Sequence, residues 1–243
     1  MQTDSFFQQL FDYSRQVTPY LEGEVTSCPQ DKTGFGLVHI DNDCSDDIQG
    51  LYLRLKQENP EAGAAYWLTR TWDLLCWQPM YLAFVSIYAC HGLPPLKRIG
   101  QGVHANFVAG FSFENHQHTH ASQEELIDMA GRDLQELYSF YRQSIDSWTR
   151  IRPGFTHHLI ADGILGCLIK LQNFVPELTN DYLLAQAQLW FKAFQLPEKL
   201  LASLRVDDET GHLKLVRTSC CLVYKCEGRK LCADCPRHPD NKK

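Results

Sequence analysis

Four cysteines near the C-terminal end have the type and spacing of a metal centre. Cys220 and Cys221 are adjacent, ten residues follow, and Cys232 and Cys235 then stand three positions apart, just before Pro236. Thiolate sulfur is the ligand of iron–sulfur clusters and of many structural zinc sites. The sequence therefore predicts one metal centre in this window of 16 residues, holding either iron–sulfur or zinc.

The spacing favours iron–sulfur but leaves zinc open. Zinc sites with four cysteines usually combine two C-x2-C units, each binding the metal from a tight turn. Here only one unit has that spacing, and the side chains of Cys220 and Cys221 diverge if the chain is extended. A 2Fe–2S cluster needs two thiolates on each of two irons, so a wider frame suits it. A fifth cysteine, Cys226, lies in the spacer as a spare thiol or a replacement ligand.

The window resembles the C-terminal signature of the FhuF-type ferric-siderophore reductases. In that family an Arg precedes the Cys-Cys pair, an aromatic residue follows it and C-x2-C-P closes the motif. The stretches 217–224 (RTSCCLVY) and 232–236 (CADCP) carry these features. The resemblance implies a 2Fe–2S cofactor with Cys220, Cys221, Cys232 and Cys235 as ligands. The family pattern has no cysteine at position 226, so we expect Cys226→Ser to keep the cluster.

The resemblance also implies a function. One electron enters the cluster from an external donor, such as a ferredoxin or its reductase. It leaves to Fe(III) in a hydroxamate or citrate–hydroxamate siderophore, and Fe(II) is released in the cytoplasm, because hard oxygen ligands hold Fe(III) more tightly. Two other classes remain open. A ferredoxin-like electron carrier would hold the same cluster without binding a chelate, and a zinc-stabilised binding protein would be colourless.

Basic residues are the candidates for binding an anionic chelate, because Arg and Lys pair with carboxylates. Arg217 flanks the cysteines, where its charge would favour a reduced cluster, although an ordinary salt bridge also explains it. Four further candidates are predicted at loops or helix ends, where an unliganded surface charge is the alternative: Lys97, Arg98, Arg150 and Arg152.

Charge argues against nucleic acid as a partner. The net charge is −6, while residues 225–243 contain six Lys or Arg against three acidic residues. An acidic body with so small a basic segment does not suit a phosphate backbone. The basic tail is either a solvated terminus or a rim suited to an anionic siderophore or an acidic redox partner.

The N-terminal sequence has no pattern of a signal peptide, so we expect the ten cysteines to be reduced in a cytoplasm. Residues 74–96 contain no Asp, Glu, Lys or Arg and could be mistaken for a membrane span. Gln78, Pro79, Ser86 and His91 interrupt this segment, which favours a buried helix over an integral membrane protein.

A histidine repeat is a second, weaker metal candidate. His116, His118 and His120 would share one face of a strand. Their polar neighbours favour a loop instead.

Periodicity predicts an α+β fold, with a mainly helical body, a small β-sheet and a C-terminal cysteine-rich iron–sulfur lobe. Hydrophobic residues make up 44% of the chain, as expected of a globular protein. We expect two domains, a siderophore-binding body (1–210) and a cluster-binding segment (211–243). The first predicted helix is capped by Asp4 and ended by Pro19, and another is opened by a Ser122/Glu125 capping box and stopped by Pro153. Further helices are predicted over 48–56, 61–91 (broken near Pro79), 155–174 and 180–194, with a short one after Pro197. The predicted strands are 33–40, 103–113 and 212–216, and residues 94–102 are predicted to form a loop.

Overall fold

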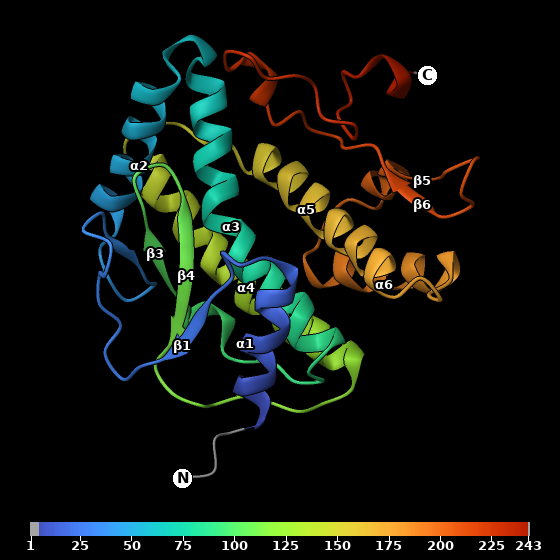
Figure 1. Cartoon of the computed structure of the whole chain (residues 1–243), viewed down its shortest axis with the longest axis horizontal. Coiled ribbons are helices and arrows are strands. Elements are labelled where there is room, and N and C mark those ends of the chain that lie inside the picture. Colours follow the sequence, from blue (N-terminus) through green and yellow to red (C-terminus); the bar gives the residue numbers. More distant parts are fainter. Residues whose placement is uncertain (1–4, 243) are drawn as a thin grey trace.

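The computed structural model describes residues 5–242, which form helices packed beside a small sheet (Figure 1). The predicted α+β class is confirmed. The helices are α1 (Ser5–Val17), α2 (Ser45–Glu58), α3 (Ala64–Tyr88), α4 (Gln123–Asp146), α5 (Pro153–Phe174) and α6 (Asn180–Ala193). The strands are β1 (Gly23–Val25), β2 (Leu37–Val38), β3 (Gly100–Val103), β4 (Val108–Phe113), β5 (Leu204–Val206) and β6 (Leu213–Leu215). Short 3-10 helices are η1 (Pro60–Ala62), η2 (Leu96–Arg98), η3 (Glu198–Ser203), η4 (Val223–Lys225) and η5 (Pro239–Asn241). The expected cap Asp4 lies outside the described residues.

The main sheet has the strand order β1-β4-β3-β2 and is mixed. β1 pairs with β4 in parallel, and the other pairs are antiparallel. A separate hairpin, β5–β6, packs against α5 and leads into the cysteine motif. Its register places Leu204 opposite Leu215, so the hairpin joins the two sides of the predicted boundary at residue 210. The division into two domains stays a prediction.

The predicted break near Pro79 is wrong, because α3 continues through this residue. Proline has no N–H, so the carbonyl of Leu75, four residues earlier, loses its helical partner. Gln101 of β3 takes its place and donates from Nε2 to the Leu75 carbonyl at 2.9 Å. Gln78 in turn donates to Gln101 Oε1 at 3.0 Å. A tertiary hydrogen bond therefore keeps the helix intact.

The apolar segment 74–96 is largely buried in the core, as predicted. No helix within residues 5–242 combines the length and the apolar character needed to cross a membrane. Trp72 of α3 and Trp190 of α6 are among the largest fully buried side chains, and they lie in one continuous hydrophobic cluster with residues of the sheet.

Several strand predictions had the wrong extent. The segment 103–113 is not one strand, because a turn closed by His104 N and the Phe107 carbonyl (2.8 Å) separates β3 from β4. Residues 100–102 belong to β3 and not to a loop. Only Leu37 and Val38 of the predicted strand 33–40 are paired, and β1 and β5 were not predicted. These strands have two or three residues, too few for an alternating pattern to be recognised.

The predicted capping box of α4 is confirmed. Ser122 accepts a hydrogen bond from Glu125 N, and the Glu125 side chain accepts one from Ser122 N. The helix ends at Asp146, earlier than expected, and the Asp146 carboxylate accepts a hydrogen bond from Ile151 N at 3.0 Å. Pro153 does not stop α4 but occupies the first turn of α5, where its missing N–H costs nothing.

Candidate metal centre

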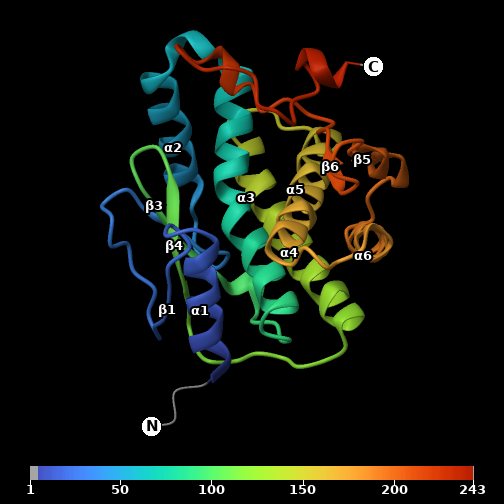
Figure 2. The ribbon, with the colours of Figure 1, turned by 45° about the vertical axis from the view of Figure 1, so that its right-hand side comes forward.

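The cysteine motif crosses one end of the molecule. From β6 the chain runs over the N-terminal half of α5 to the turn between α2 and α3, and it then returns toward the C-terminus (Figure 2). Contacts between η1 and η4 mark the turning point. Segments far apart in the sequence, α5 and the turn between α2 and α3, therefore lie against the motif and support it.

The four predicted ligands lie in two close pairs. The Sγ atoms of Cys221 and Cys232 are 3.7 Å apart, and those of Cys220 and Cys235 are 3.4 Å apart. Each pair takes one sulfur from the Cys-Cys dipeptide and one from the C-x2-C turn. Cys235 is buried, and the other three are half-buried.

The first support of this arrangement is Asp162 of α5. Its two carboxylate oxygens accept hydrogen bonds from Thr218 N (2.7 Å) and Ser219 N (2.8 Å), the residues just before the Cys-Cys pair. Burial raises the pKa of Asp162 to about 6, although the two N–H donors oppose this rise. By accepting hydrogen bonds from two backbone N–H groups, the carboxylate fixes the path of the chain just before Cys220.

The second support is Cys226, which points away from the other sulfurs. Its side chain is buried in a small cluster with Ala62 and Tyr66, apart from the main core. A side-chain hydrogen bond with Cys226 is one cause of the raised pKa of Tyr66, after burial. Next to it, Glu227 N donates to Glu61 Oε1 at 3.0 Å. Cys226 therefore anchors the spacer to the start of α3.

The third support holds the C-x2-C turn. Cys235 N donates to the Cys232 carbonyl at 3.1 Å, which closes the turn. Asn241 donates from Nδ2 to the carbonyls of Ala233 (2.7 Å) and Cys235 (2.9 Å). The last short helix thus fixes the backbone that carries two of the sulfurs.

Hydrogen-bond donors point at three of the sulfurs. Arg217 Nη2 lies 3.5 Å from Cys221 Sγ, Leu222 N lies 3.4 Å from Cys220 Sγ and Arg237 N lies 3.5 Å from Cys235 Sγ. Donors and positive charge near thiolates stabilise added negative charge. Arg217 also forms an ion pair with Asp234, from Nε to Oδ2 at 2.9 Å, which orients the guanidinium.

Burial raises the pKa of the Cys220 and Cys232 thiols. Metal binding at these thiols would release their protons.

The distances fit a centre with two metals better than one with a single metal. Four thiolates around one tetrahedral zinc, at about 2.3 Å each, would all lie about 3.8 Å from one another. Among the residues that the structure describes, no three of these sulfurs lie within 4.8 Å of one another. Each pair alone has the spacing of two ligands on one metal, as a 2Fe–2S cluster requires.

The structure brings only one of the five basic candidates, Arg217, to the cysteines. Lys97 Nζ is paired with Glu136 at 2.9 Å, and Arg98 is paired with Asp41 (2.6 Å) and Glu114 (3.0 Å). Arg150 and Arg152 are exposed in the connection between α4 and α5. A role of these four residues in binding a chelate stays a prediction.

The histidine repeat lies in the segment between β4 and α4. The Nε2 atoms of His118 and His120 are 3.0 Å apart, and His118 stacks on Phe6 at 4.3 Å. A separate group, His39, Asp41 and Glu114, has ligand atoms within 4.8 Å of one another. Arg98 already neutralises both carboxylates of this group.

Four cysteine sulfurs in two close pairs, within one compact segment, form the ligand set of an iron–sulfur centre. Residues 217–237 match the family model described as the FhuF 2Fe-2S C-terminal domain. This match confirms the resemblance, and the segment is a 2Fe–2S cluster-binding domain of the FhuF type. The match covers only this short segment. No solved structure matches the chain.

Reasoning from the sequence missed Asp162. The signal was present, because Asp162 is the one acidic residue in the helical segment 153–174. A lone carboxylate in an apolar helix is costly unless it has partners. Its partners come from the residues before the cysteine pair, a contact that no local pattern predicts.

Proposed function

We propose that this protein is a ferric-siderophore reductase of the cytoplasm. It passes one electron to Fe(III) in a hydroxamate or citrate–hydroxamate siderophore, which releases Fe(II). The observation that supports this most directly is the cross-pairing of four cysteine sulfurs inside a segment of the FhuF 2Fe–2S type. When bound, a 2Fe–2S cluster takes up and gives back one electron.

In this proposal Cys220 and Cys235 would hold one iron, and Cys221 and Cys232 would hold the other. The adjacent cysteines suit this division because their diverging side chains each meet a different partner. A single zinc would need all four sulfurs to converge on one point, and the described geometry does not do this.

The chain's own residues hold the sulfurs and tune the centre. Asp162 and Asn241 fix the two stretches of backbone, and Arg217 supplies positive charge beside Cys221. Three half-buried sulfurs leave one side of the motif close to the surface, so a chelate and a donor can both approach.

We place the electron donor on the basic rim. Lys225, Arg229, Lys230 and Arg237 are exposed around the motif. Such a rim steers an acidic protein, such as a small ferredoxin, toward the cluster. Raising the salt concentration should then slow reduction by the donor.

The first test is the metal content of protein purified without oxygen. We expect a red-brown protein with about two irons and two sulfides and an EPR signal only after reduction. A colourless protein with one zinc and no sulfide would exclude the redox function.

The second test separates the reductase from a ferredoxin-like carrier. The reduced protein is mixed with increasing concentrations of a ferric hydroxamate, and reoxidation is followed by absorbance. A reductase gives a rate that saturates and differs between chelators. A carrier gives a rate that rises linearly with every oxidant.

A further inference from the structure

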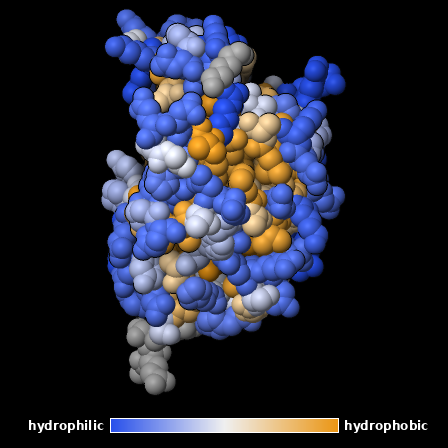
Figure 3. Space-filling model, turned by 90° about the vertical axis from the view of Figure 1, so that its right-hand side faces the viewer, coloured by the Kyte–Doolittle hydropathy of each residue, from blue (hydrophilic) through white to orange (hydrophobic). Residues whose placement is uncertain are grey.

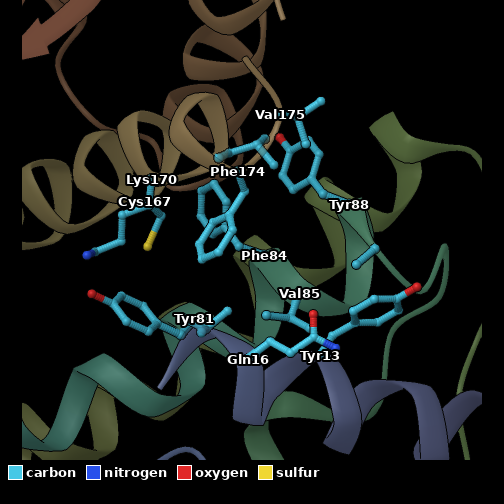
Figure 4. Close-up of a pocket in the computed structure, with 13 residues that line it drawn as sticks. Tyr13, Gln16, Tyr81, Phe84, Val85, Tyr88, Cys167, Lys170, Phe174 and Val175 are labelled. Carbon is cyan, nitrogen blue, oxygen red and sulfur yellow. The ribbon is translucent and has the colours of Figure 1, made fainter. Parts of the chain in front are cut away.

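A groove runs between α3 and α5 and begins beside the cysteine motif. Its first cavity, of about 280 Å³, is lined by Arg217 and Asp234 at one end. A second cavity, of about 270 Å³, lies next to it toward Phe174, and Tyr13 and Gln16 of α1 form one of its walls (Figure 4). Tyr81 and Lys170 line both cavities, so the two are direct neighbours, and we call the pair the groove. Together they reach the range of about 300–1,000 Å³ that is typical of small-molecule sites.

The end of this groove touches the proposed centre. Arg217 lines the first cavity and also contacts Cys221 Sγ at 3.5 Å. Asp234, on the wall beside it, precedes the ligand Cys235 in the chain. A molecule in the first cavity would therefore lie one side chain away from the sulfurs.

Two glycines keep the groove hollow. Gly163 and Gly166 lie in the interior of α5, where each costs the helix about 1 kcal/mol relative to alanine. Helix packing does not require them, because an added Cβ would lie 3.7 Å from Met80 Cε at Gly163 and 3.8 Å from Leu215 Cδ2 at Gly166. Both distances are ordinary contacts. Both glycines line the first cavity, so their effect is to leave it open.

The charges in the groove argue against an anionic ligand. Arg217 is already paired with Asp234, and Asp73 and Asp162 add two carboxyl groups. Lys170 is the remaining cation among the residues that line the two cavities. The second cavity is mostly apolar, with Phe84, Val85 and Phe174 on its walls. Such a lining suits a neutral chelate with hydrocarbon arms.

We propose that this groove binds the siderophore, as a neutral ferric trihydroxamate whose hydrocarbon arms lie between α3 and α5. Three hydroxamate anions cancel the charge of Fe(III), so the complex meets the weakly charged lining without an uncompensated charge. This inference rests on the proposed function and adds the place and charge type of the substrate.

The test uses the holoprotein and a chelate that cannot be reduced. Gallium(III) bound to N-acetylated desferrioxamine B is neutral, and calorimetry measures its affinity. Gly166→Phe fills the first cavity and should weaken binding by at least about tenfold. The matched control is Gly154→Phe, on the same helix but with no atom within 4 Å of the added Cβ and outside the groove. Its affinity should equal that of the wild type.

A second variant tests the groove at an exposed position, where a substitution does not disturb folding. Phe174 lines the far cavity and is 61% exposed, so Phe174→Asp leaves the core intact while it charges the groove. It should also weaken gallium chelate binding. In both variants the EPR spectrum and reoxidation by ferricyanide should match the wild type, whereas reoxidation by the ferric chelate slows.

The outcomes separate the two proposals. If the wild type binds and reduces the chelate but both groove variants bind it equally well, the groove is not the site and the reductase function stands. Tighter binding of anionic gallium citrate than of the neutral chelate would also overturn the inference. If the wild type neither binds nor reduces the neutral chelate but reduces a ferric citrate–hydroxamate, the inference fails and the reductase function stands. If it reduces no ferric hydroxamate or citrate–hydroxamate chelate, the proposed function itself fails.

Discussion

The five cysteines between positions 220 and 235 differ in what their side chains contact. Four sulfurs face one another in two pairs, whereas Cys226 is buried against Ala62 and Tyr66. The spacing of the residues left the role of Cys226 open. Its direction in the structure supports a packing role.

We predict that Cys226→Ser keeps the cluster. The hydroxyl can still bond to Tyr66, so the cost is a loss of stability of about 1 kcal/mol. Iron and sulfide assays and the EPR spectrum of the purified variant check this. Cys232→Ser is the matched control and should lose or alter the cluster. Equal losses in both variants would contradict the assignment of ligands.

Arg217 should set the reduction potential. We predict that Arg217→Gln lowers the midpoint potential, because it removes a positive charge that lies beside Cys221 and favours the reduced state. An EPR-monitored redox titration measures the shift. Arg237→Gln removes an exposed charge and should have a smaller effect. An unchanged potential in Arg217→Gln would contradict this tuning role.

At the scale of elements, glycines in two helices have different tasks. The Cβ of an alanine at position 131 of α4 would lie 2.6 Å from the Cβ of Ala193, so glycine is needed for the close approach of α4 to α6. At Gly166 of α5 there is room for a side chain.

We therefore predict opposite effects of the same substitution. Gly166→Ala should stabilise the protein by about 0.5–1 kcal/mol through helix propensity. Gly131→Ala should destabilise it by about 1–3 kcal/mol through overpacking. Urea unfolding of the two variants measures both. Destabilisation by Gly166→Ala would mean that α5 packs more closely than the structure shows.

At the scale of the whole molecule, Asp162 joins the cysteine motif to the helical body. We predict that Asp162→Ala speeds loss of iron to a strong chelator. Two backbone N–H groups lose their acceptor in this variant, and each unsatisfied group costs about 1–3 kcal/mol. Asp162→Asn keeps one acceptor oxygen and should be milder. Bleaching of the visible spectrum with time gives the rates. Identical rates in all three proteins would show that the motif holds itself together.

Asp73 should make the stability of the molecule depend on pH. Burial raises its pKa in the folded state to about 6 from 3.8. Because the folded state binds this proton more tightly than the unfolded state does, ionisation of Asp73 lowers the free energy of unfolding as the pH rises from about 4 to 6. The difference in free energy of unfolding between Asp73→Asn and the wild type should therefore grow by about 1 kcal/mol, in favour of the variant, from about pH 5 to pH 7.5. Urea unfolding at both pH values checks this, and a constant difference would contradict it.

One face of the molecule carries an apolar area. On the face that lies to the right in Figure 1, hydrophobic side chains gather in one area bordered by hydrophilic ones (Figure 3). The elements on this side are α5, α6 and the β5–β6 hairpin, and Phe174 and Val206 are among their exposed apolar residues.

The sequence by itself determined what depends on neighbours along the chain. The cysteine spacing, the capping box at Ser122 and the periodicity of the long helices are local signals, and they correctly predicted the cluster segment, the start of α4 and the presence of the long helices. The tertiary structure decided what depends on distant partners. Gln101 keeps α3 whole at Pro79, Asp162 holds the approach to Cys220, and α3 and α5 enclose the groove. These features rest on contacts between residues tens of positions apart, and no short-range pattern encodes them.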